Sequence, residues 1–288
     1  MNSETGPIEV HIDVTDHDAT AIELLADKTT LSKSRLKQTM IKGAVWFTRG
    51  NKTQRVRRAK KTFLPGDTLH LYYDEKVLAR EPLAPELIAD EGAYSVWFKP
   101  YGMLSQGSKW GDHCTIGRWA EQHLQPQRPA FVVHRLDRAA TGLILIAHEK
   151  KAAAALSALF QSRDIEKHYR AVVHGRFPDE EQCLTTEIDG KAATSHARKL
   201  DFAEGVNRSL VAIRIETGRK HQIRRHLSEA GFPIIGDRLY GKTEKKGAHE
   251  DLQLTAFTLA FLCPITGTPR TYHLSEDKLP RLSSLNKS

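Results

Sequence analysis

Three absences limit what this sequence can encode. No run of 18 apolar residues occurs, so no membrane-spanning helix is expected. The three cysteines, Cys114, Cys183 and Cys263, are odd in number and widely spaced, which predicts neither a disulfide framework nor a zinc site. The segment from Met1 to Asp18 is acidic and lacks the charged and then apolar pattern of a signal peptide. We therefore expect a cytoplasmic protein with no metal centre.

A fourth absence concerns acidic residues near the N-terminus. Between Lys28 and Gly66 there is no Asp or Glu, whereas twelve Lys and Arg residues occur. The whole chain of 288 residues carries a net charge of +8, so its remainder is close to neutral or slightly acidic. A solvated surface usually carries both signs, and a segment of one sign indicates a polyanionic partner. This pattern favours nucleic acid as the partner over an ordinary charged face.

The same stretch has the pattern of a small folded domain. Thr29 or Thr30 can cap a helix that starts near Ser32, and residues 44–47 and 68–73 have the composition of strands. Residues 18–75 resemble the small helix-and-loop RNA-binding domain first described in a ribosomal small-subunit protein. We expect RNA to bind to the basic side chains of its helix and of the insert that follows, namely Lys33, Arg35, Lys37, Arg55, Arg57 and Arg58.

Composition also predicts the domain boundaries. After Tyr73 the chain becomes rich in proline and acidic residues, with little periodicity, which is typical of a linker. We predict an N-terminal extension (1–17), the small basic domain (18–75), a linker (76–91) and a larger domain (92–288).

The larger domain contains short apolar strands separated by charged loops. Segments 131–133 and 142–147 are predicted strands, and the loop between them carries Arg135 and Asp137. Charged loops between rigid elements often carry catalytic groups. On this pattern alone, however, Asp137 could equally be a turn residue that accepts backbone hydrogen bonds.

A cluster of cations marks the start of a predicted helix at 221–230. Four basic residues lie at its first turns, which favours a phosphate or carboxylate site, although a basic surface helix is the alternative. The four residues are Arg219, Lys220, Arg224 and Arg225, of which we expect Arg219 and Lys220 to bind RNA. Arg224 lies near the apolar side of the helix, beside Ile223, which argues against a purely solvated role.

Taken together, several segments in order resemble the RluA-type pseudouridine synthases. The matching segments are 96–102, 134–137, 141–145, 167–175, 217–224 and 236–241. The resemblance implies that Asp137 is the essential aspartate, Tyr169 the active-site tyrosine and Arg224 the basic partner of the aspartate. Arg135 matches an arginine that occupies the space of the flipped uridine. The chain departs from the family pattern at Ala140 and Lys220, which lie outside the residues assigned to chemistry.

The resemblance implies an α+β fold in which a mixed, mostly antiparallel sheet with flanking helices follows the small α/β domain. It implies an RNA pseudouridine synthase, an isomerase that needs no cofactor. We expect a monomer whose partner is RNA, with large-subunit ribosomal RNA favoured over transfer RNA. The motifs supply one carboxylate, whereas glycosidases commonly use two, which fits an isomerase better than a hydrolase. A non-catalytic RNA-binding or ribosome-assembly protein and a nucleoside hydrolase are the alternatives.

Overall fold

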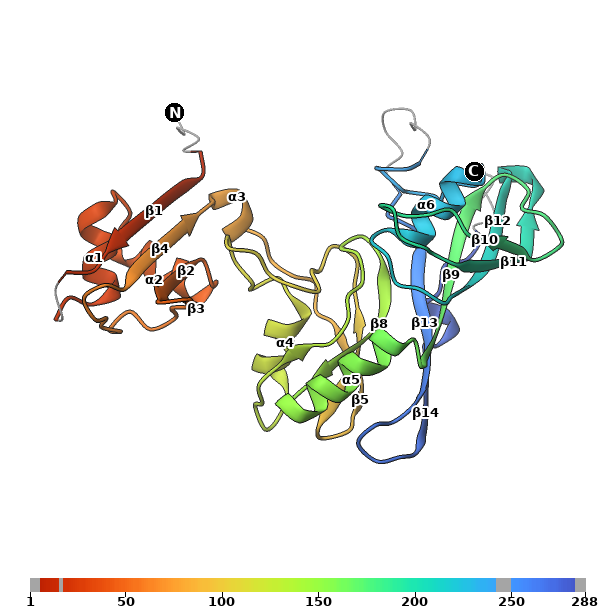
Figure 1. Ribbon diagram of the computed structural model, residues 1–288. Coiled ribbons are helices and arrows are strands. Elements are labelled where there is room, and N and C mark those ends of the chain that lie inside the picture. The colour runs from red at the N-terminus through yellow and green to blue at the C-terminus, as the bar shows by residue number, and fades with distance from the viewer. Residues whose placement is uncertain (1–5, 16–17, 242–249, 283–288) are drawn as a thin grey trace. The chain divides into compact units, whose positions relative to one another are not determined.

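The structure of the protein, a computed structural model (Figure 1), describes residues 6–15, 18–241 and 250–282. Parts of the predicted extension and the end of the predicted larger domain lie outside the described residues, at 1–5, 16–17 and 283–288.

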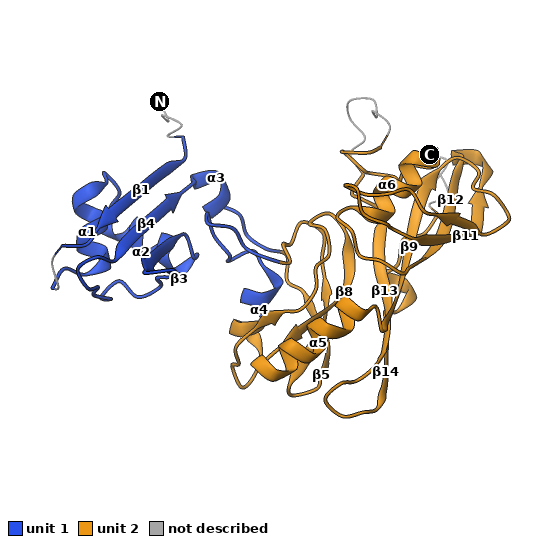
Figure 2. Ribbon diagram, in the orientation of Figure 1, with its two compact units in different colours: residues 1–82, 106–119 blue, residues 83–105, 120–288 orange. Residues whose placement is uncertain are grey.

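The chain divides into two compact units (Figure 2). The small unit contains the chain up to residue 82 and also residues 106–119, and the large unit contains 83–105 and the chain from residue 120 onward. No helix in the described part of the chain is long and apolar enough to cross a membrane.

The small unit is an antiparallel sheet covered by helices on one face. Its strand order is β1-β4-β2-β3. The strands are β1 (Ile8–Asp13), β2 (Val45–Arg49), β3 (Lys52–Arg55) and β4 (Thr68–Tyr73), and the helices are α1 (Ala21–Lys28), α2 (Lys33–Ile41) and α3 (Glu75–Leu78). In β4 the buried side chains alternate with partly exposed ones, so that Leu69 and Leu71 pack against Leu25 and Leu36 of the helices.

Two details of this unit differ from the prediction. The predicted helix start near Ser32 is confirmed, but Ser32 itself is the cap, because its side chain accepts a hydrogen bond from the backbone N–H of Arg35 at 3.2 Å. Strand β1 lies inside the predicted extension and pairs with β4 from Ile8 to Asp13, so the unit begins earlier than the predicted boundary at residue 18. This pairing joins segments about 60 residues apart, and local patterns do not report such contacts.

The large unit is built on a ten-stranded sheet. Its order is β10-β11-β12-β9-β13-β8-β6-β5, with β14 on β13 and β7 on β8. The strands are β5 (Glu86–Asp90), β6 (Tyr94–Lys99), β7 (Phe131–Val132), β8 (Thr141–Ala147), β9 (Ile165–His174), β10 (Gln182–Leu184), β11 (Ser195–Ala203), β12 (Arg208–Ile215), β13 (Leu254–Leu262) and β14 (Pro269–His273). The helices are α4 (Ile116–His123), which begins in the small unit, α5 (Lys150–Ser162) and α6 (Gln222–Glu229), with 3₁₀ turns η1 (Glu204–Val206) and η2 (Glu276–Lys278).

The predicted fold class is confirmed, since the pairs are antiparallel except for β8 with β13 in the described part of the chain. The two parallel strands approach closely at Gly142, where a Cβ atom would lie 2.1 Å from the carbonyl oxygen of Ala256. Gly142 also has a φ of +120°, so both the space and the backbone require glycine. This contact joins β8 to β13 at the start of β8, four to five residues after Asp137 in the chain.

Candidate active site

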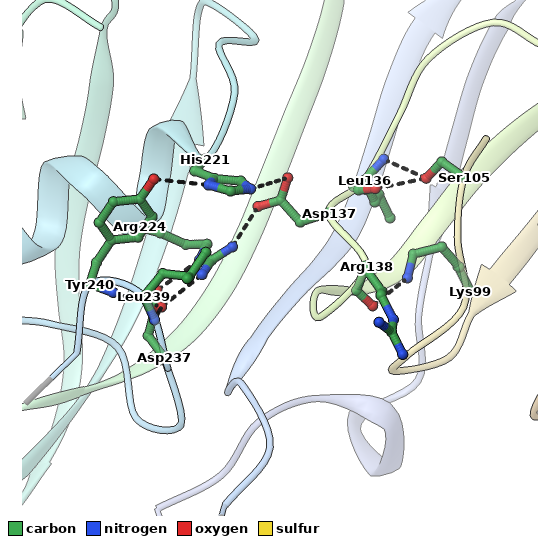
Figure 3. A network of polar contacts seen from close by, with 10 residues as sticks. All are labelled: Lys99, Ser105, Leu136, Asp137, Arg138, His221, Arg224, Asp237, Leu239 and Tyr240. Atoms are coloured by element: carbon green, nitrogen blue, oxygen red, sulfur yellow. Dashed lines mark hydrogen bonds and ion pairs between the residues drawn. The ribbon is translucent and has the colours of Figure 1, made fainter. Parts of the chain in front are cut away.

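Asp137 lies in the loop between β7 and β8, and hydrogen bonds fix the residues on both sides of it (Figure 3). The hydroxyl of Ser105 donates to the carbonyl of Leu136 at 2.7 Å and accepts from the N–H of Leu136 at 3.0 Å. The ammonium of Lys99 donates to the carbonyl of Arg138 at 3.4 Å. The Asp137 carboxylate therefore projects from a backbone that is held from both directions.

Lys99 connects the loop that carries Asp137 with the loop that follows β6. It is fully buried at the end of β6, and its ammonium also donates to the carbonyls of Pro100 and Met103, at 3.1 and 3.0 Å. Burial lowers the pKa of Lys99 to about 7, while the nearby Asp137 carboxylate acts in the opposite direction. The prediction gave Lys99 no role, and the only signal in the sequence is a lysine at the end of an apolar strand.

Arg224 reaches Asp137 from helix α6. Its side chain is 5% exposed, and its Nη1 lies 3.4 Å from Oδ2 of Asp137. The same guanidinium donates two hydrogen bonds to Asp237, from Nε and Nη2, both at 2.7 Å. Burial on its own would lower the pKa of Arg224, but the bonds to Asp237 outweigh it and the pKa is raised. Arg224 is thus a permanent cation with one fixed partner and one longer contact to Asp137.

Asp237 anchors this arginine and is itself almost completely buried, with a side chain 1% exposed. The backbone N–H groups of Leu239 and Tyr240 donate to its Oδ1, at 2.9 and 3.1 Å. Burial on its own would raise the pKa of Asp237, but the bonds from Arg224 and from the two amides lower it. The sequence placed Asp237 in a matching segment but assigned it no role.

His221 contacts the other oxygen of Asp137. It precedes α6 in a left-handed conformation with a φ of 55°, which is uncommon for residues other than glycine. Its Nε2 lies 3.8 Å from Asp137 Oδ1, and its Nδ1 lies 2.9 Å from the hydroxyl of Tyr240. Burial lowers the pKa of His221, and Asp137 acts in the opposite direction. His221 was not predicted as a neighbour of Asp137, although it lies in the matching segment 217–224.

Tyr169 lies on β9 and is 9% exposed. Burial, and then the Asp137 carboxylate, raise the pKa of its phenol, so the hydroxyl keeps its proton at neutral pH. Tyr169, Asp137 and Arg224 line one open cavity. The structure therefore brings together three residues from segments far apart in the chain. Among the described residues that line this cavity, Asp137 supplies the only carboxylate.

The predicted RNA-binding residues of the large unit fall into two groups. Arg135 and Arg219 line the same cavity, and Arg219 donates to the carbonyl of Ala192 at 3.1 Å. Lys220 is exposed and does not line the cavity, although its chain neighbours Arg219 and His221 do.

In the small unit, three of the predicted RNA-binding arginines have internal partners. The Asp112 carboxylate contacts Arg55 Nε at 3.1 Å and pairs with Arg57, and the Arg55 guanidinium stacks on the Trp46 ring at 4.0 Å. These contacts attach residues 106–119 to the sheet and give Arg55 and Arg57 a structural role. Their binding to RNA stays a prediction. Arg35 pairs with Glu75 at 3.1 Å.

The remaining basic residues predicted to bind RNA in this unit are exposed. They are Lys33 and Lys37 on α2, and Arg58 in the insert.

Comparison with known proteins identifies the family to which the chain is similar. The model of the family described as RNA pseudouridylate synthase matches residues 93–229. The chain is 31% identical over 206 residues to the dual-specificity RNA pseudouridine synthase RluA of Vibrio parahaemolyticus, covering 65% of this chain and 81% of that protein. It is 33% identical over 159 residues to ribosomal large subunit pseudouridine synthase D of Zymomonas mobilis, and this match covers 47% of the chain and about half (49%) of that relative.

Solved structures share the fold. Human RNA pseudouridylate synthase domain containing 1 superposes with a TM-score of 0.59 at 21% identity, covering 71% of this chain and 89% of that one.

Proposed function

Because the chain belongs to the RNA pseudouridine synthase family, we propose that it isomerises selected uridines in structured RNA to pseudouridine, with Asp137 as the catalytic carboxylate. The observation that carries this proposal is the environment of Asp137. One carboxylate faces the cavity, a buried arginine lies 3.4 Å from it, and a protonated tyrosine lines the same cavity.

The chemistry explains why one carboxylate is enough. In this isomerisation the bond between C1′ of the ribose and N1 of uracil breaks, the base turns, and C1′ bonds to C5. The proton on C5 leaves and N1 gains one, so the reaction needs no water and no external group. A hydrolase would commonly use a second carboxylic acid to protonate the leaving group. Asp237 cannot supply that acid, because Arg224 and two amides hold it as a buried carboxylate.

The neighbours of Asp137 have distinct roles in this proposal. Arg224 keeps Asp137 ionised when RNA displaces water from the cavity, because a nearby cation favours the charged carboxylate. Tyr169 presents a flat ring for stacking on uracil and a hydroxyl beside the reacting base. The target base must leave its stack to reach the cavity, and Arg135 fills the vacated space. Asp137 acts on the sugar, on the base or by abstracting a sugar proton.

The substrate proposed is large-subunit ribosomal RNA rather than transfer RNA. The small unit supports it, since such a basic domain suits a large folded RNA, and Lys33, Lys37 and Arg58 are exposed there. One matched relative is named for the ribosomal large subunit and another for dual specificity. We further propose a cytoplasmic monomer that acts without a cofactor.

The direct test maps pseudouridines in total RNA from cells with and without the protein, by carbodiimide-dependent stops of reverse transcription. Loss of defined stops, restored by the wild type and not by Asp137→Asn, is the expected result. The variant should bind RNA within a few-fold of wild type, because the change removes one charge from the cavity and leaves the basic surface intact. Asp189→Asn serves as the control, since Asp189 pairs with Arg225 at the surface.

Three outcomes would contradict the proposal. If the purified protein released free uracil from RNA, it would be a hydrolase. If Asp137→Asn left every stop in place, Asp137 would not be catalytic. If the purified protein bound ribosomal RNA and isomerised no uridine in it, the protein would be an RNA-binding or ribosome-assembly protein.

A further inference from the structure

A second cavity adjoins the catalytic one in the large unit and has no role in the chemistry above. It is open to solvent, and it shares Arg135, Tyr169 and Arg219 with the catalytic cavity. Two further cations, Lys167 and Arg163, line it as well. Among its described lining residues there is no Asp or Glu.

Lys167 is the most unusual of these cations. It lies on β9 two residues before Tyr169, so both side chains emerge on the same face of the strand, about 7 Å apart. Lys167 is 7% exposed, and no carboxylate or carbonyl pairs with its ammonium in the described part of the chain. The ammonium lies over the Phe160 ring, with Nζ 6.0 Å from the ring centroid. A cation on a side chain this buried, with no anion beside it, is costly, which points to a ligand that supplies one.

The surroundings of Lys167 reinforce this requirement. Burial lowers the pKa of Lys167, and the neighbouring Arg163 lowers it further. Arg163 ends α5 in a left-handed conformation with a φ of 68° and lines the same cavity. The cavity thus holds cations from β9, from the end of α5 and from the segment before α6, with no fixed counter-charge among its described residues.

The remaining wall of the cavity is neutral. His134 stacks on Phe160 with ring centroids 4.1 Å apart, and its Nε2 accepts a hydrogen bond from the N–H of Leu145 at 2.9 Å. Burial, and then Lys167, lower the pKa of His134 to about 3, so it adds no charge at neutral pH. A neutral wall behind several cations strengthens their attraction for an anion, because little water screens it.

We propose that this second cavity binds a phosphodiester of the RNA strand adjacent to the target uridine, with Lys167 and Arg163 as its ligands. The inference rests on the proposed function, since it assumes that the target base enters the cavity beside Tyr169. One nucleotide can span the two cavities, with its base beside Tyr169 and a flanking phosphate beside Lys167. Lys167 is then a positioning residue, which fixes the strand and leaves the chemistry to Asp137.

The test combines variants with RNA in which single phosphates are neutralised. Once the target uridine is mapped, a substrate RNA is made with a methylphosphonate at each phosphate that flanks it, one at a time. Wild-type protein should lose about 10-fold in kcat/KM at one position, as expected for loss of a charge-assisted contact. Lys167→Gln should lose a similar factor on unmodified RNA and lose no more when that same phosphate is neutralised.

Two control variants separate this site from charge in general. Lys167→Arg keeps the cation and should retain most of the activity. Lys151→Gln removes an exposed lysine from α5 and should behave as wild type. It should be fully active on unmodified RNA and should lose the same factor in kcat/KM as wild type when the critical phosphate is neutralised. Lys167→Gln should also reduce the slope of log Kd against log salt by about 0.7, the value for one phosphate contact on single-stranded RNA.

The outcomes distinguish this inference from the proposed function. If wild type isomerised the RNA and no flanking phosphate mattered, the phosphate site would be refuted and the synthase would stand. The methylphosphonate scan uses the wild-type protein, so it tests the phosphate site even if a variant does not fold. If Lys167→Gln remained as sensitive as wild type at the critical position, another residue would bind that phosphate. If wild type failed to isomerise any uridine, the proposed function itself would fail.

Discussion

The buried pair of Arg224 and Asp237 gives the sharpest test of how the site is held. Asp237→Asn preserves the shape of the side chain and removes its charge. Arg224 would then lose its fixed partner while remaining 5% exposed, with the contact to Asp137 at 3.4 Å as its only ion pair among the described residues. The predicted effects are a loss of stability and a loss of activity with distinct causes.

The magnitude follows from the burial of both groups. Removing one partner of a buried ion pair commonly costs about 3–5 kcal/mol, because the other charge stays buried without compensation. Asp137 offers Arg224 a second carboxylate and asparagine can still accept one hydrogen bond, so the lower end, about 3 kcal/mol, is expected. In a unit of this size each kcal/mol lowers the melting temperature by about 2–4 °C, which gives a decrease of about 6–12 °C.

The measurement is thermal unfolding followed by circular dichroism, with single-turnover isomerisation measured at 25 °C, where the variant is still folded. Activity should fall at least 10-fold, because Arg224 is free to turn toward Asp137 and displace it from the base. The matched control is Asp189→Asn, which removes the partner of Arg225 on the same helix. That pair is exposed, with the Asp189 side chain 69% accessible, so little change is expected.

The reasoning would be refuted if Asp237→Asn and Asp189→Asn melted at the same temperature. Such a result would mean that the buried pair contributes no more than a surface pair. If Asp237→Asn melted lower but isomerised at the wild-type rate, Asp237 would stabilise the fold without positioning Arg224 for the reaction.

Three further predictions concern pH, the small unit and RNA binding. The pKa of Asp237 is lowered in the folded state, so its stabilisation is complete above the unfolded value of about 3.9 and is lost as pH falls through the folded value. Acid unfolding below about pH 4 should therefore be shallower in Asp237→Asn than in wild type, and equal slopes would contradict this. Asp112→Asn should destabilise the small unit by about 2 kcal/mol in denaturant titrations, because Arg55 and Arg57 lose a shared, mostly buried carboxylate. An unchanged denaturation midpoint would show that the ion pairs of Asp112 with Arg55 and Arg57 do not stabilise the small unit. Replacing both Lys33 and Lys37 by Gln should lower the slope of log Kd against log salt for RNA binding by about 1.5. The same change at Lys150 and Lys151 should leave the slope unchanged. If both double variants had the same slope, α2 would not contact the RNA.

Much of the fold could be predicted because its elements carry local signals. The alternation in β4, the apolar run of β8 and the amphipathic pattern of α6 each fix an element within a few residues of the observed bounds. Strand β1 was missed because it is a half-exposed edge strand, whose identity depends on pairing with β4.

The residues of the candidate site could be predicted in part for a similar reason. Asp137, Tyr169 and Arg224 lie in segments that match a known pattern, and the structure places them around one cavity. The supporting residues could not be assigned, because their roles depend on long-range contacts. Asp237 matters through Arg224, and Lys99 through carbonyls of two loops. In the sequence, nothing distinguishes Lys167 from other lysines in strands. Only the structure shows that its side chain is buried without an ion-pair partner among the described residues.

The small unit is completed by residues 106–119, so it is not formed by one continuous stretch of chain. The chain passes between the two units after residues 82, 105 and 119, so the small unit is not a terminal appendage. A cut after residue 82 would separate Arg55 and Arg57 from Asp112 and would leave the segment without the surface it packs on. In this chain the two units therefore alternate along the sequence, and the small unit, for which we propose RNA binding, cannot be removed intact by a single cut.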